Sequence, residues 1–324
     1  MSTPLLQVKN LCTSFDVDAG EVRAVNGISF SLDKGKVLGI VGESGSGKSV
    51  TAYSIMRILV EPGRIKSGEI LFDGQDIVKF SKKQMSEFRG KRVSIIFQDP
   101  MTSLNPTYTI GNQLREAILL HTNRNHEQAN ARAVEMLKLV GVNEPEKRLK
   151  QYPHELSGGQ LQRISILRSM LLKPKFLVVD EPVSMLDVSV RADIINMLLK
   201  LVENHNTSIL FISHDISIIR YVSARVAVMY LGNIVEMGET DTIIHHPLHP
   251  YTQALISNCA SIDLDEKREP IRIEGEPPSP VDPKPCCPFA GRCFCEQEIC
   301  WREKPQLRHM ADGRVVACHL VKEK

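Results

Sequence analysis

The chain has 324 residues, of which 42% are hydrophobic and 24% charged, so it is long enough for one large globular domain with an appendage. Its formal net charge of +2 gives no electrostatic basis for nucleic acid as the main partner. The sequence contains no apolar run of about 18 residues, the length of a membrane span, and its N-terminus lacks the segments of a secretory signal peptide. We therefore expect a cytosolic protein.

The N-terminal part of the chain predicts strands, then a loop and a helix. Residues Leu5–Val8 and Val25–Ser31 alternate apolar and polar positions, as half-buried strands do. The nearly all-apolar Val37–Val41 is typical of a strand buried on both faces. After a loop over Gly42–Ser49, apolar residues between Ala52 and Leu59 share one helical face.

The same alternation returns further along the chain. Phe176–Val179 and Ile209–Ile212 are short apolar runs, and apolar residues at helical spacing lie between them. Strands that alternate with helices predict an α/β fold with a mostly parallel sheet. A mostly helical insert is expected over roughly 104–152.

The loop Gly42–Ser49 matches the pattern G-x-x-x-x-G-K-[ST] at every fixed position, between a predicted strand and a predicted helix. Its glycines would let backbone N–H groups wrap a phosphate chain, with the helix N-terminus adding partial positive charge. We expect Lys48 to reach the β- and γ-phosphates and the Ser49 hydroxyl to bind Mg²⁺. The alternative is a Gly/Ser turn without function. It does not account for the predicted strand before the loop, the predicted helix after it and the Lys48-Ser49 pair.

Two acidic residues follow the buried strand Phe176–Val179. Carboxylates at the end of a parallel strand lie where ligands of α/β sheets bind. We expect Asp180 to hold the Mg²⁺ shell and Glu181 to polarise an attacking water. Alone, two acidic residues after a strand are a weak indication of a nucleotide site. The phosphate loop earlier in the chain makes this interpretation stronger.

A third motif names a family. Leu156–Gln160 reads LSGGQ and is followed by Arg163. It resembles the signature of ATP-binding cassette (ABC) ATPases, at the usual interval before Asp180. A Ser and two Gly at a helix start form a second anion cradle, which in this family closes over the ATP held by a facing subunit. An ordinary helix cap is the alternative for Ser157 taken alone.

The resemblance implies further roles in chain order. Gln98 matches the glutamine that senses the γ-phosphate and Mg²⁺ and faces the permease. Ser184–Asp187 resembles the dimer-contact loop, although Met185 replaces the usual Ala. His214 matches the histidine that contacts the γ-phosphate, and Phe15 falls where an aromatic ring stacks on adenine, with a core role as the alternative.

These matches define the expected sites. The catalytic residues are Glu181, His214, Gln98 and Lys48, and the Mg²⁺ ligands are Ser49, Gln98 and Asp180. The facing subunit's ATP would be contacted by Ser157, Gly158, Gly159, Gln160 and Asp187. The ATP-binding residues are Phe15, Gly42, Glu43, Ser44, Gly45, Ser46, Gly47, Lys48, Ser49 and Val50.

The implied fold is an ABC-type phosphate-loop ATPase core. It combines a RecA-like, mostly parallel sheet with an N-terminal antiparallel β-subdomain and a helical subdomain. We expect the ATPase domain over 1–250, its helical subdomain over about 104–160, and a small cysteine-rich extension over 251–324.

Three stretches resemble the branch that imports dipeptides and oligopeptides: Phe97–Pro106, His249–Leu255 and Glu274–Pro280. The implied function is ATP hydrolysis that energises peptide uptake through two membrane permeases at the cytoplasmic face of the membrane. A soluble binding protein and a second ATPase subunit, identical or related, complete the machinery. The alternatives are the same machinery for nickel complexes, glutathione or oligosaccharides, and a cassette ATPase without a transport role.

Six of the eight cysteines lie in the last 39 residues, which in a reducing cytosol favours a metal site over disulfides. In the peptide-importer branch the tail can carry a [4Fe–4S] cluster, for which the candidates are Cys287, Cys293, Cys300 and Cys318. Their spacing lacks the close pair of cysteines typical of structural zinc. Three alternatives stay open. The tail could hold zinc, it could hold no metal, or Cys286 or Cys295 could replace one of the four ligands.

Overall fold

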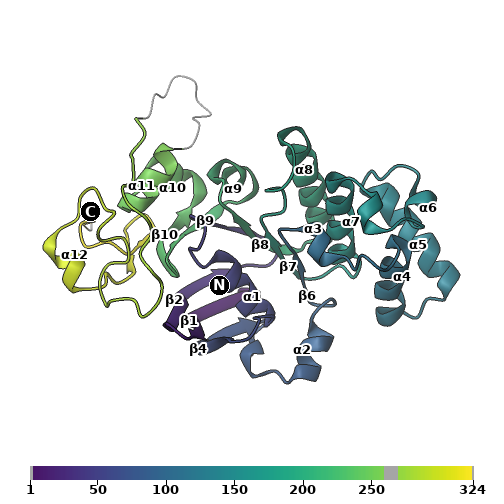
Figure 1. The fold of residues 1–324 in the computed structure, drawn as a ribbon, viewed down its shortest axis with the longest axis horizontal. Helices are drawn as coiled ribbons and strands as arrows, with labels where there is room; N and C mark the ends of the chain where they lie inside the picture. Colours follow the sequence, from purple (N-terminus) through teal and green to yellow (C-terminus); the bar gives the residue numbers. More distant parts are fainter. Residues whose placement is uncertain (1–2, 259–268, 323–324) are drawn as a thin grey trace. The chain divides into compact units, whose positions relative to one another are not determined.

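The computed structural model describes residues 3–258 and 269–322, so Cys259 lies outside the described residues. Contacts between residues divide the chain into two compact units (Figure 1). The first unit spans Met1–Phe80 and Leu210–Lys324, and the second spans Ser81–Ile209. The expected division into 1–250 and 251–324 stays a prediction.

An antiparallel sheet of four strands, in the order β2-β1-β4-β5, opens the first unit. Strand β1 (Leu6–Val17) pairs with both β2 (Gly20–Leu32) and β4 (Gly63–Phe72), and β5 (Gln75–Asp76) lies at the edge. One face is apolar: Leu6, Val8, Ile28 and Phe72 are buried, as their alternation with polar residues predicts. Helix α1 (Lys48–Met56) contacts β1, β2 and β4.

The second sheet of this unit follows the order β11-β12-β10-β9-β3-β8. Strand β3 (Val37–Val41) pairs in parallel with β9 (Arg225–Tyr230), and β8 (Ser208–Ser213) comes next in the order. Strand β10 (Asn233–Glu239) is antiparallel to β9. The reason is the turn at Leu231 and Gly232, whose φ angles of 41° and 75° suit a tight hairpin. The sheet thus has the expected parallel pairing of β3 with β9 and adds antiparallel pairing at β10.

Helices cover this sheet, and the C-terminal segment joins it. The helices are α9 (Ile216–Val222), α10 (Thr240–His245) and α11 (Pro250–Ser257), which contact β3, β9 or β10. Beyond them lie α12 (Glu298–Arg302), β11 (Arg308–His309) and β12 (Val315–Val316). The Ala317 N–H donates to the Val235 carbonyl at 2.8 Å, and the Asp282 N–H donates to the Glu21 carbonyl at 2.9 Å.

The second unit is mostly helical, with one parallel strand pair. Strand β6 (Val93–Ile96) pairs with β7 (Phe176–Asp180), all five residues of which are buried. The helices are α2 (Lys82–Phe88), α3 (Pro100–Ser103), α4 (Ile110–His121), α5 (His126–Leu139), α6 (Pro145–Arg148), α7 (Gly158–Met170) and α8 (Val188–His205). Short 3₁₀ turns occur at Ile77–Lys79 in the first unit and at Pro153–Glu155 in the second.

Helix α7 is the centre of the second unit. It contacts α3, α5, α8 and β6, and its side chains Ile164, Ile166 and Leu167 are fully buried. Buried residues lie on most sides of α7, with the polar Gln162 and Ser165 among them, so the helix is enclosed by its neighbours rather than lying on the surface. These contacts fix the direction of the N-terminal end of α7, whose N-cap is Ser157.

A layer of aromatic rings holds α11 in the first unit. The rings of Tyr230, Tyr251 and Phe289 pack with centroid distances of 4.7, 5.2 and 5.5 Å. His249 lies beside them, and its Nδ1 accepts the Tyr251 N–H at 3.0 Å, which caps the helix. Burial lowers the pKa of His249 to about 3.

We expect this buried histidine to make the protein sensitive to acid. The unfolded chain binds a proton at His249 below pH 6.5, whereas the folded chain does not until about pH 3. Stability contributed by the neutral ring is therefore lost as the pH falls through this window, by about 2 kcal/mol at pH 5. Denaturant unfolding at pH 7 and pH 5 measures this loss.

The matched variant is His249→Asn, since asparagine keeps a capping acceptor but does not titrate. Its loss between pH 7 and pH 5 should be smaller than that of the parent by the same amount. Parallel pH profiles for parent and variant would show that His249 is not the responsible group.

Candidate nucleotide site

The phosphate loop Gly42–Ser49 lies between β3 and α1 in the first unit, as its motif predicts. Glycine is required at two of its positions by space. A Cβ on Gly47, whose φ is 95°, would lie 2.3 Å from the Ala24 carbonyl oxygen, and one on Gly42 would lie 2.2 Å from that of Met229. The loop backbone thus packs directly against neighbouring backbone, which fixes its course.

Lys48 is held inside this loop. Its Nζ donates to the carbonyl oxygens of Gly42 and Glu43 at 2.8 and 2.9 Å, and lies 3.5 Å from the Ser46 hydroxyl. The side chain is only 5% exposed. A buried ammonium needs several acceptors, and these acceptors keep the charge beside the exposed Ser44 and Gly45, where an anionic ligand can approach.

Two other predicted residues of the first unit lie at its surface. His214, directly after β8, is exposed. Phe15 lies on β1 and is half-buried, and its ring is packed so closely on Gly63 that a Cβ there would lie 2.4 Å from it. Their roles at a γ-phosphate and an adenine ring stay predictions.

In the second unit, Gln98 and Glu181 are brought together. The Gln98 Nε2 donates to the Glu181 carboxylate at 3.2 Å and lies 3.4 Å from the Ser184 hydroxyl, which donates to the Glu181 carbonyl at 3.1 Å. Glu181 has a φ of 45°, a strained conformation for a residue with a side chain, of the kind concentrated at functional sites. Asp180 ends β7 and is 1% exposed.

The signature residues form the exposed start of α7. Ser157 is the N-cap, and it and Gln160 exchange side-chain hydrogen bonds with each other's backbone N–H at 3.4 and 3.2 Å. Gly158 and Gly159 form the first turn without side chains in the way of a ligand. The free N–H groups and the helix dipole make this end attractive to an anion.

Exposed apolar side chains lie at the loop Ser184–Asp187, whose predicted role is dimer contact. Met185 and Val188 are 64% and 78% exposed and flank the exposed Asp187, the residue before α8. Whether another chain covers these side chains stays a prediction. The predicted site residues thus divide between the units: the phosphate loop and His214 in the first, and Gln98, Asp180, Glu181, Asp187 and the signature in the second.

Sequence reasoning missed three residues around Glu43. The Glu43 N–H donates to the Tyr251 hydroxyl at 2.8 Å, and its carboxylate accepts from Arg292 Nη1 at 3.0 Å. The same Nη1 donates to the Tyr230 hydroxyl at 3.0 Å. Only Tyr251 had a signal, as part of the family-like stretch His249–Leu255.

The cysteines of the C-terminal segment lie near one another. Cys287, Cys300 and Cys318 are buried and Cys293 is partly buried, and the Cys287 N–H donates to the Cys300 carbonyl at 2.9 Å. Burial, reinforced by neighbouring thiols, raises the pKa of Cys287 to about 11 and that of Cys293 to about 12.

The cysteines do not form a ready metal site. The sulfur atoms of Cys293 and Cys295 lie 3.6 Å apart. Within residues 3–258 and 269–322, no group of three or more His, Cys, Asp or Glu side chains is arranged to hold a metal ion.

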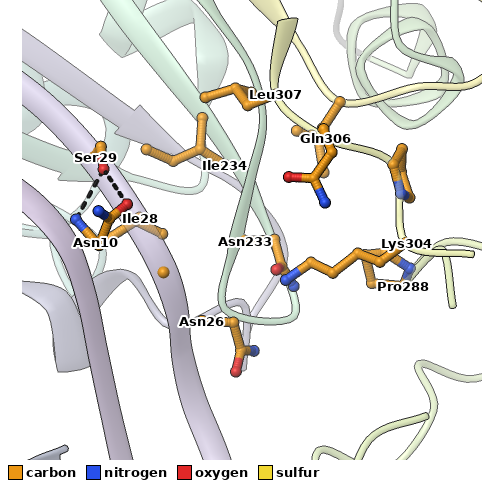
Figure 2. A pocket seen from close by; sticks show the side chains of 14 residues that line it. Asn10, Asn26, Ile28, Ser29, Asn233, Ile234, Pro288, Lys304, Gln306 and Leu307 are labelled. Carbon is orange, nitrogen blue, oxygen red and sulfur yellow. Dashed lines mark hydrogen bonds between the residues drawn. The ribbon is translucent and has the colours of Figure 1, made fainter. Parts of the chain in front are cut away.

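Residues of the C-terminal segment help to line a polar cavity of about 290 Å³ (Figure 2). Asn26, Asn233 and Lys304 are among the residues that line it. The Nδ2 atoms of Asn26 and Asn233 donate to the Leu231 carbonyl at 3.1 and 2.7 Å. The next residue, Gly232, donates its N–H to the Ser46 carbonyl at 2.9 Å, so the wall of the cavity supports the phosphate loop.

Comparison with known proteins identifies the family. Residues 25–184 match the family model described as ABC transporter, and residues 235–300 match the one described as oligopeptide/dipeptide transporter, C-terminal region. The oligopeptide transport ATP-binding protein OppD of Bacillus subtilis is 45% identical over 98% of this chain and 89% of its own length. The dipeptide transport ATP-binding protein DppD of Escherichia coli is 41% identical over 97% of this chain and 96% of its own.

Solved structures agree with the fold. The cassette cbiO1 of Clostridium perfringens, part of the ABC transporter complex cbiONQ, aligns with a TM-score of 0.64 at 26% identity over 76% of this chain and 92% of its own. The dimeric cassette MJ0796 bound to ADP and Pi aligns with a TM-score of 0.65 at 23% identity over 72% of this chain and 98% of its own. The resemblance of the motifs is thereby confirmed: the chain belongs to the ABC transporter ATPases, in the branch that carries the oligopeptide/dipeptide transporter C-terminal region.

Proposed function

We propose that this chain is the ATP-hydrolysing subunit of an importer of dipeptides or oligopeptides. The observation that carries the proposal is the presence in one chain of the nucleotide-site motifs and of a region, residues 235–300, that matches the oligopeptide/dipeptide transporter C-terminal family model. The phosphate loop, the Gln98–Glu181 pair and the signature helix are intact. The relatives that match nearly the whole chain are named for oligopeptide and dipeptide transport.

The chain would work with partners at the cytoplasmic face of the membrane. None of the helices within the described ranges is long and apolar enough to cross a membrane. In this proposal two separate permeases form the channel, a binding protein delivers the peptide, and the region around Gln98 transmits motion to the permeases.

Two ATPase subunits, identical or paralogous, would face each other. Each MgATP would lie between the Lys48 loop of one subunit and the Ser157 helix end of the other. Ser49, Asp180 and Gln98 would hold Mg²⁺, and Glu181 would orient the attacking water. ATP binding would close the pair, and hydrolysis would release it. The exposed Met185 and Val188 support a partner surface beside Asp187.

Glu181→Gln tests the catalytic assignment. The amide cannot accept a proton from water, so we expect hydrolysis to fall by about 10²- to 10⁴-fold while MgATP binding persists. Steady-state phosphate release and equilibrium nucleotide binding measure the two effects. The matched control is Glu203→Gln, since Glu203 is exposed on α8, and it should hydrolyse ATP as the parent does. Unchanged turnover in Glu181→Gln would remove Glu181 from the mechanism.

The cargo is tested with the reconstituted transporter. We expect ATP hydrolysis by the subunit, its permeases and its binding protein in liposomes to rise when dipeptides or oligopeptides are added. Nickel complexes, glutathione and oligosaccharides are the comparison ligands. Stimulation by one of these alone would replace the peptide assignment, and hydrolysis without any membrane partner in the cell would favour a cassette ATPase outside transport.

We also propose that the C-terminal cysteines hold a [4Fe–4S] cluster. Thiolates are the usual ligands of such clusters, and burial of Cys287, Cys300 and Cys318 gives a soft donor set shielded from water. Burial raises the pKa of the Cys287 and Cys318 thiols, and a bound cation would favour the thiolate. Within the described residues no three of these side chains are arranged to hold a metal ion, so cluster binding would require the thiols to change position.

The cluster is tested by the iron and sulfide content of the chain purified without oxygen. We expect Cys287→Ser and Cys300→Ser to lose most of the bound iron, whereas Cys12→Ser, on β1, should keep it. Cys286→Ser and Cys295→Ser decide whether either residue replaces a ligand. Zinc in place of iron, or a parent chain with neither metal, would contradict the proposal.

A further inference from the structure

Glu43 is an unfavourable residue for a phosphate site unless its charge is balanced. It is the second residue of the phosphate loop, and its side chain is 32% exposed. A carboxylate beside a bound triphosphate repels it, and more strongly where protein atoms lower the local dielectric constant. The structure therefore needs a compensating positive charge at this position.

Arg292 supplies that charge from the far end of the sequence. Its side chain is 9% exposed, and its Nη1 lies 3.0 Å from the Glu43 carboxylate. The Nη1 also contacts the Tyr230 hydroxyl at 3.0 Å, and the Nε donates to the Gly275 carbonyl at 3.2 Å. With its guanidinium carbon 5.8 Å from the centre of the Tyr230 ring, Arg292 is fixed on several sides.

The position of Glu43 matters because its backbone is part of the loop. Its N–H donates to the Tyr251 hydroxyl, and its carbonyl oxygen accepts from Lys48 Nζ. A shift of the Glu43 side chain would move this carbonyl and with it the ammonium that faces the nucleotide. Arg292 thus acts on Lys48 through one intervening residue.

The segment that carries Arg292 is itself anchored to the core. The Phe289 ring packs on Tyr230 and Tyr251 with centroid distances of 5.2 and 5.5 Å, and the Arg292 N–H donates to the Phe289 carbonyl at 3.2 Å. Because Phe289 is 1% exposed, it fixes the turn from which Arg292 extends. The C-terminal segment is therefore a support of the phosphate loop.

We propose that Arg292 is a positioning residue for the nucleotide site, which neutralises Glu43 and holds the loop backbone that orients Lys48. The affinity of the subunit for MgATP then depends on its C-terminal segment. This inference rests on the part of the proposed function that assigns ATP to the Lys48 loop, and it does not depend on the cargo or on a metal.

The test measures MgATP binding to the isolated full-length subunit with a fluorescent nucleotide, alongside its melting temperature. We expect Arg292→Ala to weaken binding by about tenfold, the effect of losing one charge-assisted hydrogen bond. Arg292→Lys should recover part of the affinity, since lysine restores the charge but not the fork of donors. Arg302→Ala, which removes an exposed arginine of the same segment, should leave binding unchanged.

The double variant separates neutralisation from simple support of the fold. Glu43→Gln removes the repelling charge and keeps an acceptor for Arg292, so it should bind MgATP at least as tightly as the parent. Adding Glu43→Gln to Arg292→Ala should recover most of the lost affinity, a coupling that loss of folding would not produce. Glu43→Gln alone also tests the idea if Arg292→Ala does not fold.

Three results would overturn the proposal: unchanged binding in Arg292→Ala, a tenfold loss in Glu43→Gln, or a double variant that binds no better than Arg292→Ala. These outcomes differ from failure of the proposed function. A parent chain that does not bind MgATP would remove both, whereas a transporter stimulated by a different cargo would leave the role of Arg292 intact.

Discussion

The phosphate loop of the first unit is arranged around one buried ammonium group, that of Lys48. Lys48 is almost completely buried, and the carbonyl oxygens of Gly42 and Glu43 stabilise its charge. Those carbonyls point inward because the loop passes so close to neighbouring backbone that a Cβ on Gly42 or Gly47 would not fit. Backbone from Ala24 and Met229 sets that limit, so the two neighbouring strands shape the site before any nucleotide arrives.

A second constraint acts at the start of α7. The helix is enclosed by other elements of the second unit, and its first turn is exposed. A buried helix with an exposed N-terminus directs unpaired N–H groups outward, where they attract an anion. In the same unit, Glu181 keeps a strained backbone while its carboxylate accepts from Gln98. Strain of this kind at Glu181 is costly for stability and is concentrated at functional sites.

Some of this could be read from the sequence, because the information is local. The phosphate loop, the strand before Asp180 and the capped start of α7 are each specified by consecutive residues, and the structure places them as expected. Contacts between residues that are far apart in the sequence could not be predicted from it. Arg292 lies 249 positions from Glu43, and nothing in its surroundings distinguishes it from an exposed arginine. The antiparallel turn at Leu231 and Gly232 and the closeness of Cys293 to Cys295 likewise depend on local backbone conformation that the residue pattern does not determine.

In the proposed function, ATP is bound between two subunits that contribute different helix ends. Sedimentation of the Glu181→Gln subunit with MgATP, alone or mixed with its paralogous partner, tests it most directly when combined with Ser157→Arg. We expect Ser157→Arg to abolish ATP-dependent association and to leave nucleotide binding to the isolated subunit unchanged. Association that persists, or a loss of binding as large as that of Lys48→Ala, would contradict it.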